Sequence, residues 1–245
     1  AWVNEAVDYS ADVGEYSSLG IGSTYNDIYI GYYDASSQSL KAARYMASTG
    51  WLSGTVDAGP GVGRYTSLAM ARYPQVVYYD ITNDQLKYAE MDMTGFWDFS
   101  KSPVNAAGDG GMYASLALDS NNDPRVSYFD STNNELVYAQ HTGASWTNRT
   151  IDAVGSSAVQ TAIAVDGNDY AHIAYYDDIG GALRYAAFNG SAWVTKTIDS
   201  SGVLGYPAID IDSAGYPHIT YQTTVGLKHA WLHPSPDLVV TDIWY

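Results

Sequence analysis

The feature that most constrains the fold is an internal repeat of about 47 residues. The tripeptide Tyr-Tyr-Asp, or a variant of it, recurs five times at steps of 46, 50, 47 and 46 residues. Its copies end at Asp34, Asp80, Asp130, Asp177 and Thr223. Repeats of this length are typical of propellers and solenoids, in which each repeat is one supersecondary unit that packs against its neighbours.

Each repeat has the pattern of four short strands. The first alternates large apolar residues with Ser, Ala or Gly, as in residues 67–70, and is followed by a turn rich in Asp, Gly, Asn and Pro. The second ends in the tripeptide, and the third is of the Leu-Lys-Tyr-Ala type. The fourth starts at a Trp and generally ends at an acid, as in residues 193–199. We expect the large residues of the first strand to pack between sheets and the small ones to face a central channel.

The fifth repeat has no fourth strand directly after Ala230, but a matching segment lies at the other end of the chain. Trp2 and Asp8 have the same separation as Trp193 and Asp199. An N-terminal strand that completes the last sheet would close a ring and remove its exposed edges. The sequence therefore predicts an all-β, five-bladed β-propeller of four-stranded blades over residues 1–232.

Composition narrows the range of partners. The formal net charge is −16, so the field of the protein disfavours nucleic acid and anionic membrane surfaces. There is no cysteine, which excludes disulfides and thiolate metal sites. No run of 18 apolar residues occurs, so no membrane insertion is predicted.

The Ser-Leu-Ala, Tyr-Tyr-Asp and Leu-Lys-Tyr-Ala segments resemble the tandem repeats of secreted bacterial and archaeal propellers. Blade number and repeat length are also similar to those of tachylectin-type propellers, five-bladed lectins that bind N-acetylated sugars between blades. Sialidase-type Asp boxes are absent. The resemblance implies an extracellular or cell-surface location and favours, at the level of the fold, a glycan as partner.

The segment 233–245 has two interpretations. Residues 236–243 resemble the start of a CARDB-type domain, an immunoglobulin-like module of large surface proteins, with a Pro-containing linker before them. The other interpretation is a C-terminal strand packed on the rim of the propeller. Two sequons, at Asn148 and Asn189, are candidate glycosylation sites of an exported protein.

The loops of one propeller face predict an acidic surface rimmed by tyrosine, able to bind sugar hydroxyls or a cation. Its candidate residues are Tyr16, Tyr65, Tyr113, Asp34, Asp80, Asp130 and Asp177. A scaffold role explains the same residues well, because they recur from repeat to repeat: each Asp would cap a turn and each Tyr would pack between blades. No cofactor is predicted; calcium is compatible with the acidic face, but no dedicated calcium loop is present.

Positions that break the repeat are better indicators of function. The residues that begin the second strands are Tyr29, Gln75, Arg125, His172 and His218. The two histidines suggest metal binding, but no third ligand is evident, and a solvated strand face explains them equally. Asp210 replaces the usual small residue of a first strand, either as a partly desolvated carboxylate or as an acceptor for a neighbouring backbone amide.

Three functions are compatible with these patterns. The preferred hypothesis is a non-catalytic extracellular recognition or adhesion module for carbohydrate or another cell-surface ligand. The second is a structural subunit of a surface layer or filament, which predicts self-association. The third is a polysaccharide hydrolase or lyase, which needs two carboxylates at a defined separation. The periodic residues Trp2, Trp51, Trp97, Trp146 and Trp193 either stack on sugar rings or pack at the outer rim.

Overall fold

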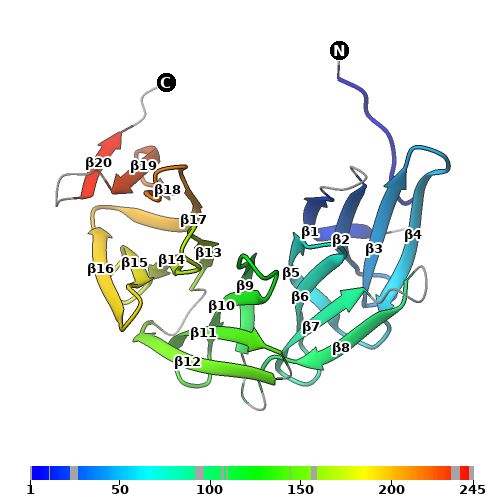
Figure 1. Ribbon diagram of the computed structural model, residues 1–245, viewed down its shortest axis with the longest axis horizontal. Coiled ribbons are helices and arrows are strands. Elements are labelled where there is room, and N and C mark those ends of the chain that lie inside the picture. Colours follow the sequence, from blue (N-terminus) through cyan, green and yellow to red (C-terminus); the bar gives the residue numbers. More distant parts are fainter. Residues whose placement is uncertain are drawn as a thin grey trace. The chain divides into compact units, whose positions relative to one another are not determined.

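A computed structural model describes residues 2–10, 12–22, 27–91, 97–105, 108, 110–143, 145–155, 159–232 and 238–242. Within these residues all regular structure is β, in twenty strands that form five antiparallel four-stranded sheets. We number the sheets 1 to 5 in chain order. In each sheet the strands follow one another in sequence, as the colours of Figure 1 show. The predicted all-β architecture of repeated four-stranded sheets is confirmed.

The chain forms two compact units, residues 1–107 and 108–245. In the first unit, sheet 1 contains β1 (Val13–Ile21), β2 (Ile28–Asp34), β3 (Ser39–Met46) and β4 (Gly50–Asp57). Sheet 2 contains β5 (Val62–Met70), β6 (Pro74–Asp80), β7 (Gln85–Met91) and β8 (Phe99–Pro103).

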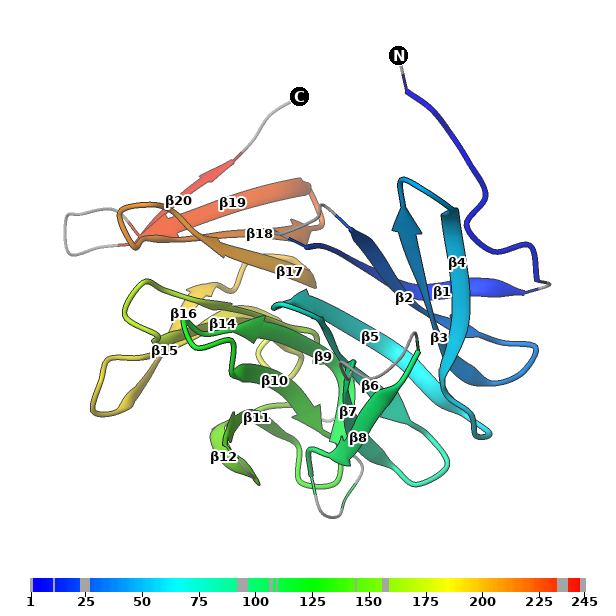
Figure 2. The ribbon, with the colours of Figure 1, turned by 45° about the vertical axis from the view of Figure 1, so that its right-hand side comes forward.

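The second unit holds the other three sheets (Figure 2). Sheet 3 contains β9 (Gly110–Leu118), β10 (Pro124–Asp130), β11 (Glu135–Thr142) and β12 (Ser145–Ala153). Sheet 4 contains β13 (Thr161–Val165), β14 (Ala171–Asp177), β15 (Ala182–Phe188) and β16 (Trp193–Asp199). Sheet 5 contains β17 (Val203–Ile211), β18 (Pro217–Thr223), β19 (Gly226–Leu232) and β20 (Leu238–Asp242).

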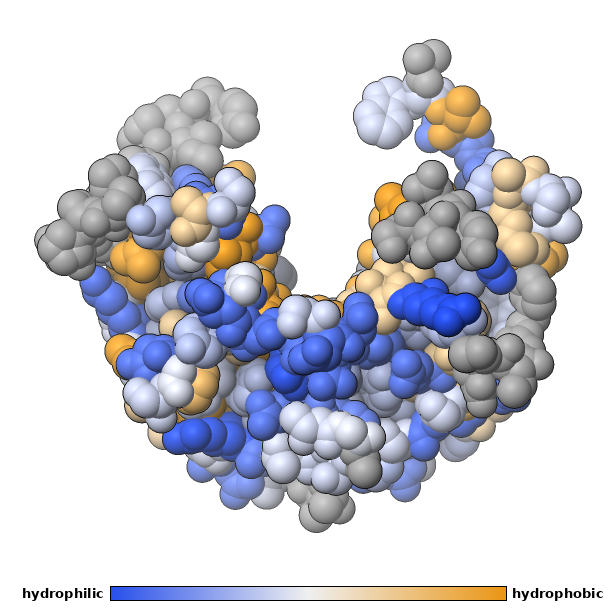
Figure 3. Space-filling view, in the orientation of Figure 1, coloured by the Kyte–Doolittle hydropathy of each residue, from blue (hydrophilic) through white to orange (hydrophobic). Residues whose placement is uncertain are grey.

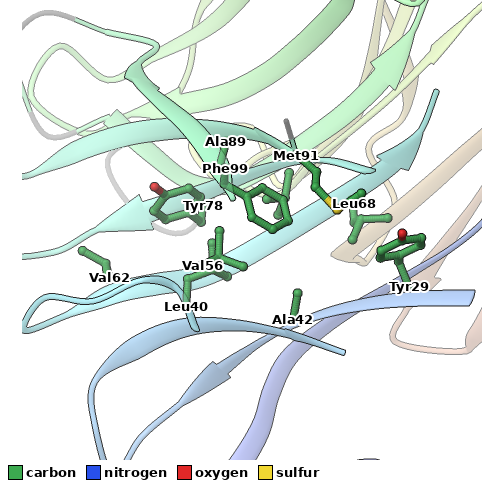
Figure 4. Close-up of a cluster of buried hydrophobic side chains, with 11 residues drawn as sticks. Tyr29, Leu40, Ala42, Val56, Val62, Leu68, Tyr78, Ala89, Met91 and Phe99 are labelled. Atoms are coloured by element: carbon green, nitrogen blue, oxygen red, sulfur yellow. The ribbon is translucent and has the colours of Figure 1, made fainter. Parts of the chain in front are cut away.

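The cores lie between successive sheets of a unit. In the first unit, Leu40 and Val56 of sheet 1 meet Leu68, Tyr78 and Phe99 of sheet 2 (Figure 4). Side chains alternate between the two faces of a strand, so sheet 4 contributes to one core with sheet 3 and to another with sheet 5. As predicted, the large residues of most first strands are buried between sheets.

The first strands begin earlier than the sequence pattern suggests. The segment before Leu68, expected to be a loop, is a bulged extension of β5, whose register against β6 shifts twice between Val62 and Ser67. Gly63 makes this possible, because its φ is 109° and a Cβ there would lie 2.7 Å from the Cα of Leu40. Exposed apolar residues are found on these first strands as well, including Leu19 and Leu204. Figure 3 shows hydrophobic residues at the surface among hydrophilic ones.

A recurring polar cluster joins the successive sheets within each unit. The aspartate at the end of one fourth strand accepts a hydrogen bond from the first tyrosine of the following tripeptide and pairs with a Lys or Arg of the third strand. We call it the Asp–Tyr–base cluster. Between sheets 1 and 2, Asp57 of β4 accepts from the Tyr78 hydroxyl at 2.8 Å and from Lys87. The other copies centre on Asp8, Asp152 and Asp199.

Sheet 5 differs from the prediction. Its fourth strand is β20, residues 238–242, whereas the expected segment, residues 2–8, contains no strand. The sequence of β20, Leu-Val-Val-Thr-Asp, explains why this segment forms the fourth strand. It is rich in β-branched residues and ends in an acid, as β4 and β16 do. Its backbone pairs with the otherwise open edge of β19. Residues 233–237 and 243–245 of the predicted linker and domain stub lie outside the described residues.

The first prediction concerns the Asp–Tyr–base cluster. Asp57→Asn leaves the charge of Lys87 half-buried with only Asp80, at 3.9 Å, nearby. We expect a loss of about 2 kcal/mol in the free energy of unfolding, measured by urea denaturation at pH 7. The double variant Asp57→Asn/Lys87→Val should recover at least half of that loss, because it removes the cation that the single variant deprives of its nearer partner, while Asp80 keeps its hydrogen bonds from Thr82 and Asn83.

The double variant reproduces a combination that the chain already uses, since sheet 3 has Val137 at the lysine position and the preceding repeat ends in Asn105. Glu15→Gln on an exposed position is the matched control and should change stability by less than about 0.5 kcal/mol. A double variant as unstable as the single one would contradict this account.

A second prediction concerns acid. Burial alone would raise the pKa of Asp199, but hydrogen bonds from Ser201, Lys228 and Tyr221 lower it below its ordinary value. A carboxyl group whose pKa is lower in the folded than in the unfolded chain, where it is about 3.9, stabilises the fold at pH values above about 3.9. This stabilisation is lost as the pH falls below that value. We therefore expect the thermal midpoint to stay level from neutral pH to about 5 and to fall below about 4. Asp199→Asn should make that fall shallower, and an unchanged slope would refute the assignment.

Candidate functional site

The candidate site is a pocket of about 510 Å³ between sheets 3 and 4, both in the second unit. Sheet 3 contributes Arg125, Tyr138, Gln140, Thr147, Asn148 and Arg149. Sheet 4 contributes Asn168, Asp169, Tyr170, Ala171, Phe188 and Trp193. Strand residues of both sheets and the turn before β14 provide this lining, so the pocket lies where two neighbouring repeats meet.

A buried ion pair stands at one end of the pocket. The Arg125 guanidinium pairs with the carboxylate of Asp119 and also donates to the backbone oxygen of His141 at 3.3 Å. Asp119 is fixed in turn by backbone amides of Asn121 and Asp123, both at 2.9 Å. These bonds hold the guanidinium of Arg125 in one orientation, and Arg125 is one of the residues that line the pocket.

Aromatic rings form the walls. The rings of Tyr138 and Trp193 lie 4.9 Å apart, and those of Phe188 and Trp193 lie 5.9 Å apart. Tyr170 meets Phe188 edge-on at 5.9 Å. Burial raises the pKa of Tyr138 to about 12, so its hydroxyl remains a proton donor at neutral pH. The pocket thus combines apolar ring faces with fixed polar groups, as small-molecule sites commonly do.

The carboxylate of Asp169 lies on the polar rim. Its two oxygens accept from the backbone amide and the hydroxyl of Ser120, both at 2.7 Å. These hydrogen bonds lower the pKa of Asp169, which keeps the group ionised. They also tie the turn of sheet 3 to the turn of sheet 4, so the rim is held by contacts between the two sheets.

The corresponding space between sheets 1 and 2 is filled. Trp97 is the counterpart of Trp193, and Gly54 stands where sheet 3 has Arg149. A Cβ at Gly54 would lie only 2.6 Å from the indole of Trp97, so the ring packs directly onto the strand. Tyr29, the counterpart of Arg125, is buried in the same cluster. The pocket between sheets 3 and 4 therefore depends on residues that depart from the repeat.

The tyrosines predicted as ligand contacts lie in the bulges of the first strands, away from the pocket. Tyr16, Tyr65 and Tyr113 have φ values of 52°, 52° and 54°. The rings of Tyr16 and Tyr65 lie 4.8 Å apart, and the backbone oxygen of Tyr113 accepts from the hydroxyl of Thr161 at 2.9 Å. These contacts join neighbouring sheets, while Tyr16 remains 39% exposed. Their role as ligand contacts stays a prediction.

The predicted aspartates cap turns. Asp80 accepts from the backbone amides of Thr82 and Asn83, both at 3.1 Å, and Asp130 makes the equivalent bonds with Thr132 and Asn133. The same arrangement is found at Asp34 and Asp177. None of the four lines the pocket.

Asp210 lies opposite His218 in the register of β17 and β18, whereas His172 belongs to sheet 4. Asp210 is exposed, and its carboxylate accepts from the neighbouring amide of Ile211 at 2.8 Å, which matches the second of its predicted interpretations. His172 and His218 each lie near an aspartate of their own turn, Asp166 at 3.5 Å and Asp212 at 3.4 Å. Within the described residues no group of three potential metal ligands is found.

Sequence reasoning identified part of the pocket. Arg125 was expected to matter because it breaks the repeat, and Trp193 belongs to the periodic tryptophans for which sugar stacking was one interpretation. Arg149 and Tyr170 were missed, although aligning the repeats strand by strand would have shown Gly, Ser, Arg and Lys at the position of Arg149. The first sequon, Asn148, lies on the pocket wall in β12, so a glycan on it would occupy the pocket; Asn189 lies in the turn before β16.

No family model matches the chain, and no curated protein matches it. Solved structures do. The SapL1 lectin, in complex with alpha-methyl fucoside, is 14% identical with a TM-score of 0.66, over 95% of this chain and 82% of that one. The fold is that of a β-propeller.

Two further structures agree. The fungal lectin of Aleuria aurantia, a six-bladed β-propeller with a fucose recognition mode, is 14% identical with a TM-score of 0.60, over 92% of this chain and 78% of that one. A protein of unknown function from Dyadobacter fermentans is 10% identical with a TM-score of 0.60, over 91% and 74%. In the described part of this propeller, no helix has the length and apolar character needed to span a membrane.

Proposed function

We propose that this propeller is a non-catalytic carbohydrate-binding module of an extracellular or cell-surface protein, and that it binds sugar in the pocket between sheets 3 and 4. The observation that carries the proposal is the combination of Tyr138, Phe188 and Trp193 with the fixed guanidinium of Arg125. A sugar ring has an apolar C–H face and a hydroxyl edge, and the pocket offers a partner for each.

The polar partners are already oriented. Because Asp119 and backbone groups hold Arg125, little side-chain freedom is lost when its donors meet hydroxyls. Hydrogen bonds from an ionised donor are roughly twice as strong as neutral ones. The propeller fold shared with fucose-binding lectins supports the proposal, since a lectin function is compatible with this architecture.

The composition of the pocket argues against glycoside hydrolysis. Its single lining carboxylate is Asp169, and Ser120 occupies both of its oxygens. Asp119, behind the wall, is ion-paired with Arg125. Hydrolysis requires one carboxyl group that is protonated at working pH and a second that attacks or activates water, and neither group here is placed for these tasks.

The test uses Trp193→Ala with Trp51→Ala as the matched control. Trp51 is the equivalent residue of sheet 1, away from the pocket, where its indole donates to Glu5 at 2.9 Å. A glycan array followed by calorimetry should identify a sugar that binds the native chain. Loss of one stacking partner should weaken binding at least tenfold, about 1.4 kcal/mol. Trp51→Ala should bind like the native chain, and equal losses in both variants would refute the site.

We also infer that the five sheets form a five-bladed ring closed by residues 2–8. Asp8 accepts from the Tyr32 hydroxyl at 2.6 Å and pairs with Lys41, as the last residue of a preceding fourth strand does in other sheets. Leu19 of sheet 1 is 57% exposed, whereas its counterparts Leu68 and Ile163 are 9% and 7% exposed. A sheet before sheet 1 would cover Leu19, and the strand that precedes Asp8 would belong to it.

Closure requires residues 2–8 to replace β20 on β19. In sheet 4, Asp199 pairs with Leu183 and Lys196 pairs with Tyr185. Transferred to sheet 5, this register sets Glu5 opposite His229, which in the structure faces Thr241 of β20. The two arrangements therefore compete for the same edge.

A disulfide test separates them, since the chain has no cysteine of its own. Glu5→Cys/His229→Cys should form an intramolecular cross-link on mild oxidation, seen by non-reducing electrophoresis and mass spectrometry, because directly opposed residues lie within reach. His229→Cys/Thr241→Cys is the matched control and should remain reduced. The reverse result, or cross-linked dimers, would refute closure within one chain.

A further inference from the structure

We infer that the ligand of the pocket is a glycan carrying an anionic group, a carboxylate or a sulfate, and that Arg149 binds this group. The inference rests on the proposed function and adds the chemical class of the sugar. It follows from the distribution of the few positive charges of an acidic chain.

Positive charge is scarce and mostly neutralised. Six of the eleven Lys and Arg side chains form ion pairs with aspartates. Arg125 is one of the six, and Asp119 offsets its charge at the end of the pocket. Among the described residues, no carboxylate lies within ion-pairing distance of Arg149, which stands opposite Tyr138 on β12. The pocket therefore has one guanidinium without a protein counter-ion.

The carboxylate of Asp169, at the rim of the pocket, does not neutralise the guanidinium of Arg149. Both oxygens of Asp169 are turned toward Ser120, so that carboxylate is satisfied across the junction of the two sheets. Apart from Arg125, Arg149 and Asp169, the lining residues are uncharged. A carboxylate or sulfate that enters beside the aromatic walls would meet the free fork of Arg149, whose geometry suits two oxygens of one group.

The other sheets do not consistently have a charged residue at the position equivalent to Arg149. Its counterparts are Gly54 in sheet 1 and Ser102 in sheet 2, whereas sheet 4 has Lys196. Lys196 is exposed, lies opposite Tyr185, and does not line the pocket. The chain thus provides its own control, a cation at the same place in the next repeat but outside the site.

The global field acts in the opposite direction. A net charge of −16 repels anions at long range, but at physiological ionic strength this repulsion is screened over about 8 Å. A direct contact with Arg149 is shorter than this, so local pairing outweighs the field. Removing one positive charge at either Arg149 or Lys196 changes the net charge equally, whereas only removal of Arg149 removes the contact.

The experiment compares matched sugars by calorimetry on the full chain. The pairs are methyl glucuronide with methyl glucoside, methyl galacturonide with methyl galactoside, and galactose-6-sulfate with galactose. We expect the acidic member of at least one pair to bind tenfold tighter or more, and the pair affected distinguishes carboxylate from sulfate. Arg149→Gln should abolish this preference, while Lys196→Gln, with the same change in net charge, should retain it. Arg149→Lys should keep part of it.

Each other outcome is decisive. Neutral sugars that bind as tightly as acidic ones, with binding lost in Trp193→Ala, would overturn the anionic ligand and leave the carbohydrate site standing. A preference reduced equally by Arg149→Gln and Lys196→Gln would assign it to the field and overturn the contact. If none of the sugars binds, both the proposed function and this inference are overturned.

Discussion

Each junction between sheets within a unit is fixed by a carboxylate that leaves one sheet and is bound by the next. Asp57, Asp152 and Asp199 each end a fourth strand, and each accepts from a tyrosine hydroxyl and from a Lys or Arg of the following sheet. Groups this poorly exposed need such partners, because a desolvated charge without one costs several kcal/mol. The same contact therefore sets the distance between neighbouring sheets, and with it the space left between their outer strands.

That space is filled or left open by the side chains at a few positions. Between sheets 1 and 2, glycine at residue 54 admits the indole of Trp97, and the gap is closed. Between sheets 3 and 4, Arg149 stands at the position of Gly54, and Trp193 instead packs beside Tyr138 and Phe188. One scaffold thus gives a packed junction or a pocket, and only the departures from the repeat decide which.

The repeat was sufficient to predict the strands and sheets, because strand period, turn residues and the tripeptide all agree in each copy. It was not sufficient for the first strands, where the bulge at Gly63 converts an expected loop into paired structure. It also missed β20, since residues 2–8 and 238–242 are both plausible fourth strands and sequence does not rank them. The pocket itself was not predicted, although the sequence analysis named two of its residues, Arg125 and Trp193. It requires side chains from two repeats, and their facing positions are known only once the register is fixed.

The residue at the start of the second strand shows how one position can serve either scaffold or site. In sheets 3, 4 and 5 it lies near an aspartate of the preceding turn, as Arg125, His172 and His218. Burial lowers the pKa of His172, so at neutral pH its contact with Asp166 is one between a neutral ring and a carboxylate. An arginine cannot lose its proton in the same way. Of these three second-strand residues, the pocket contains the one whose donors and charge do not vary with pH, so its polar wall is the same in acid and at neutral pH.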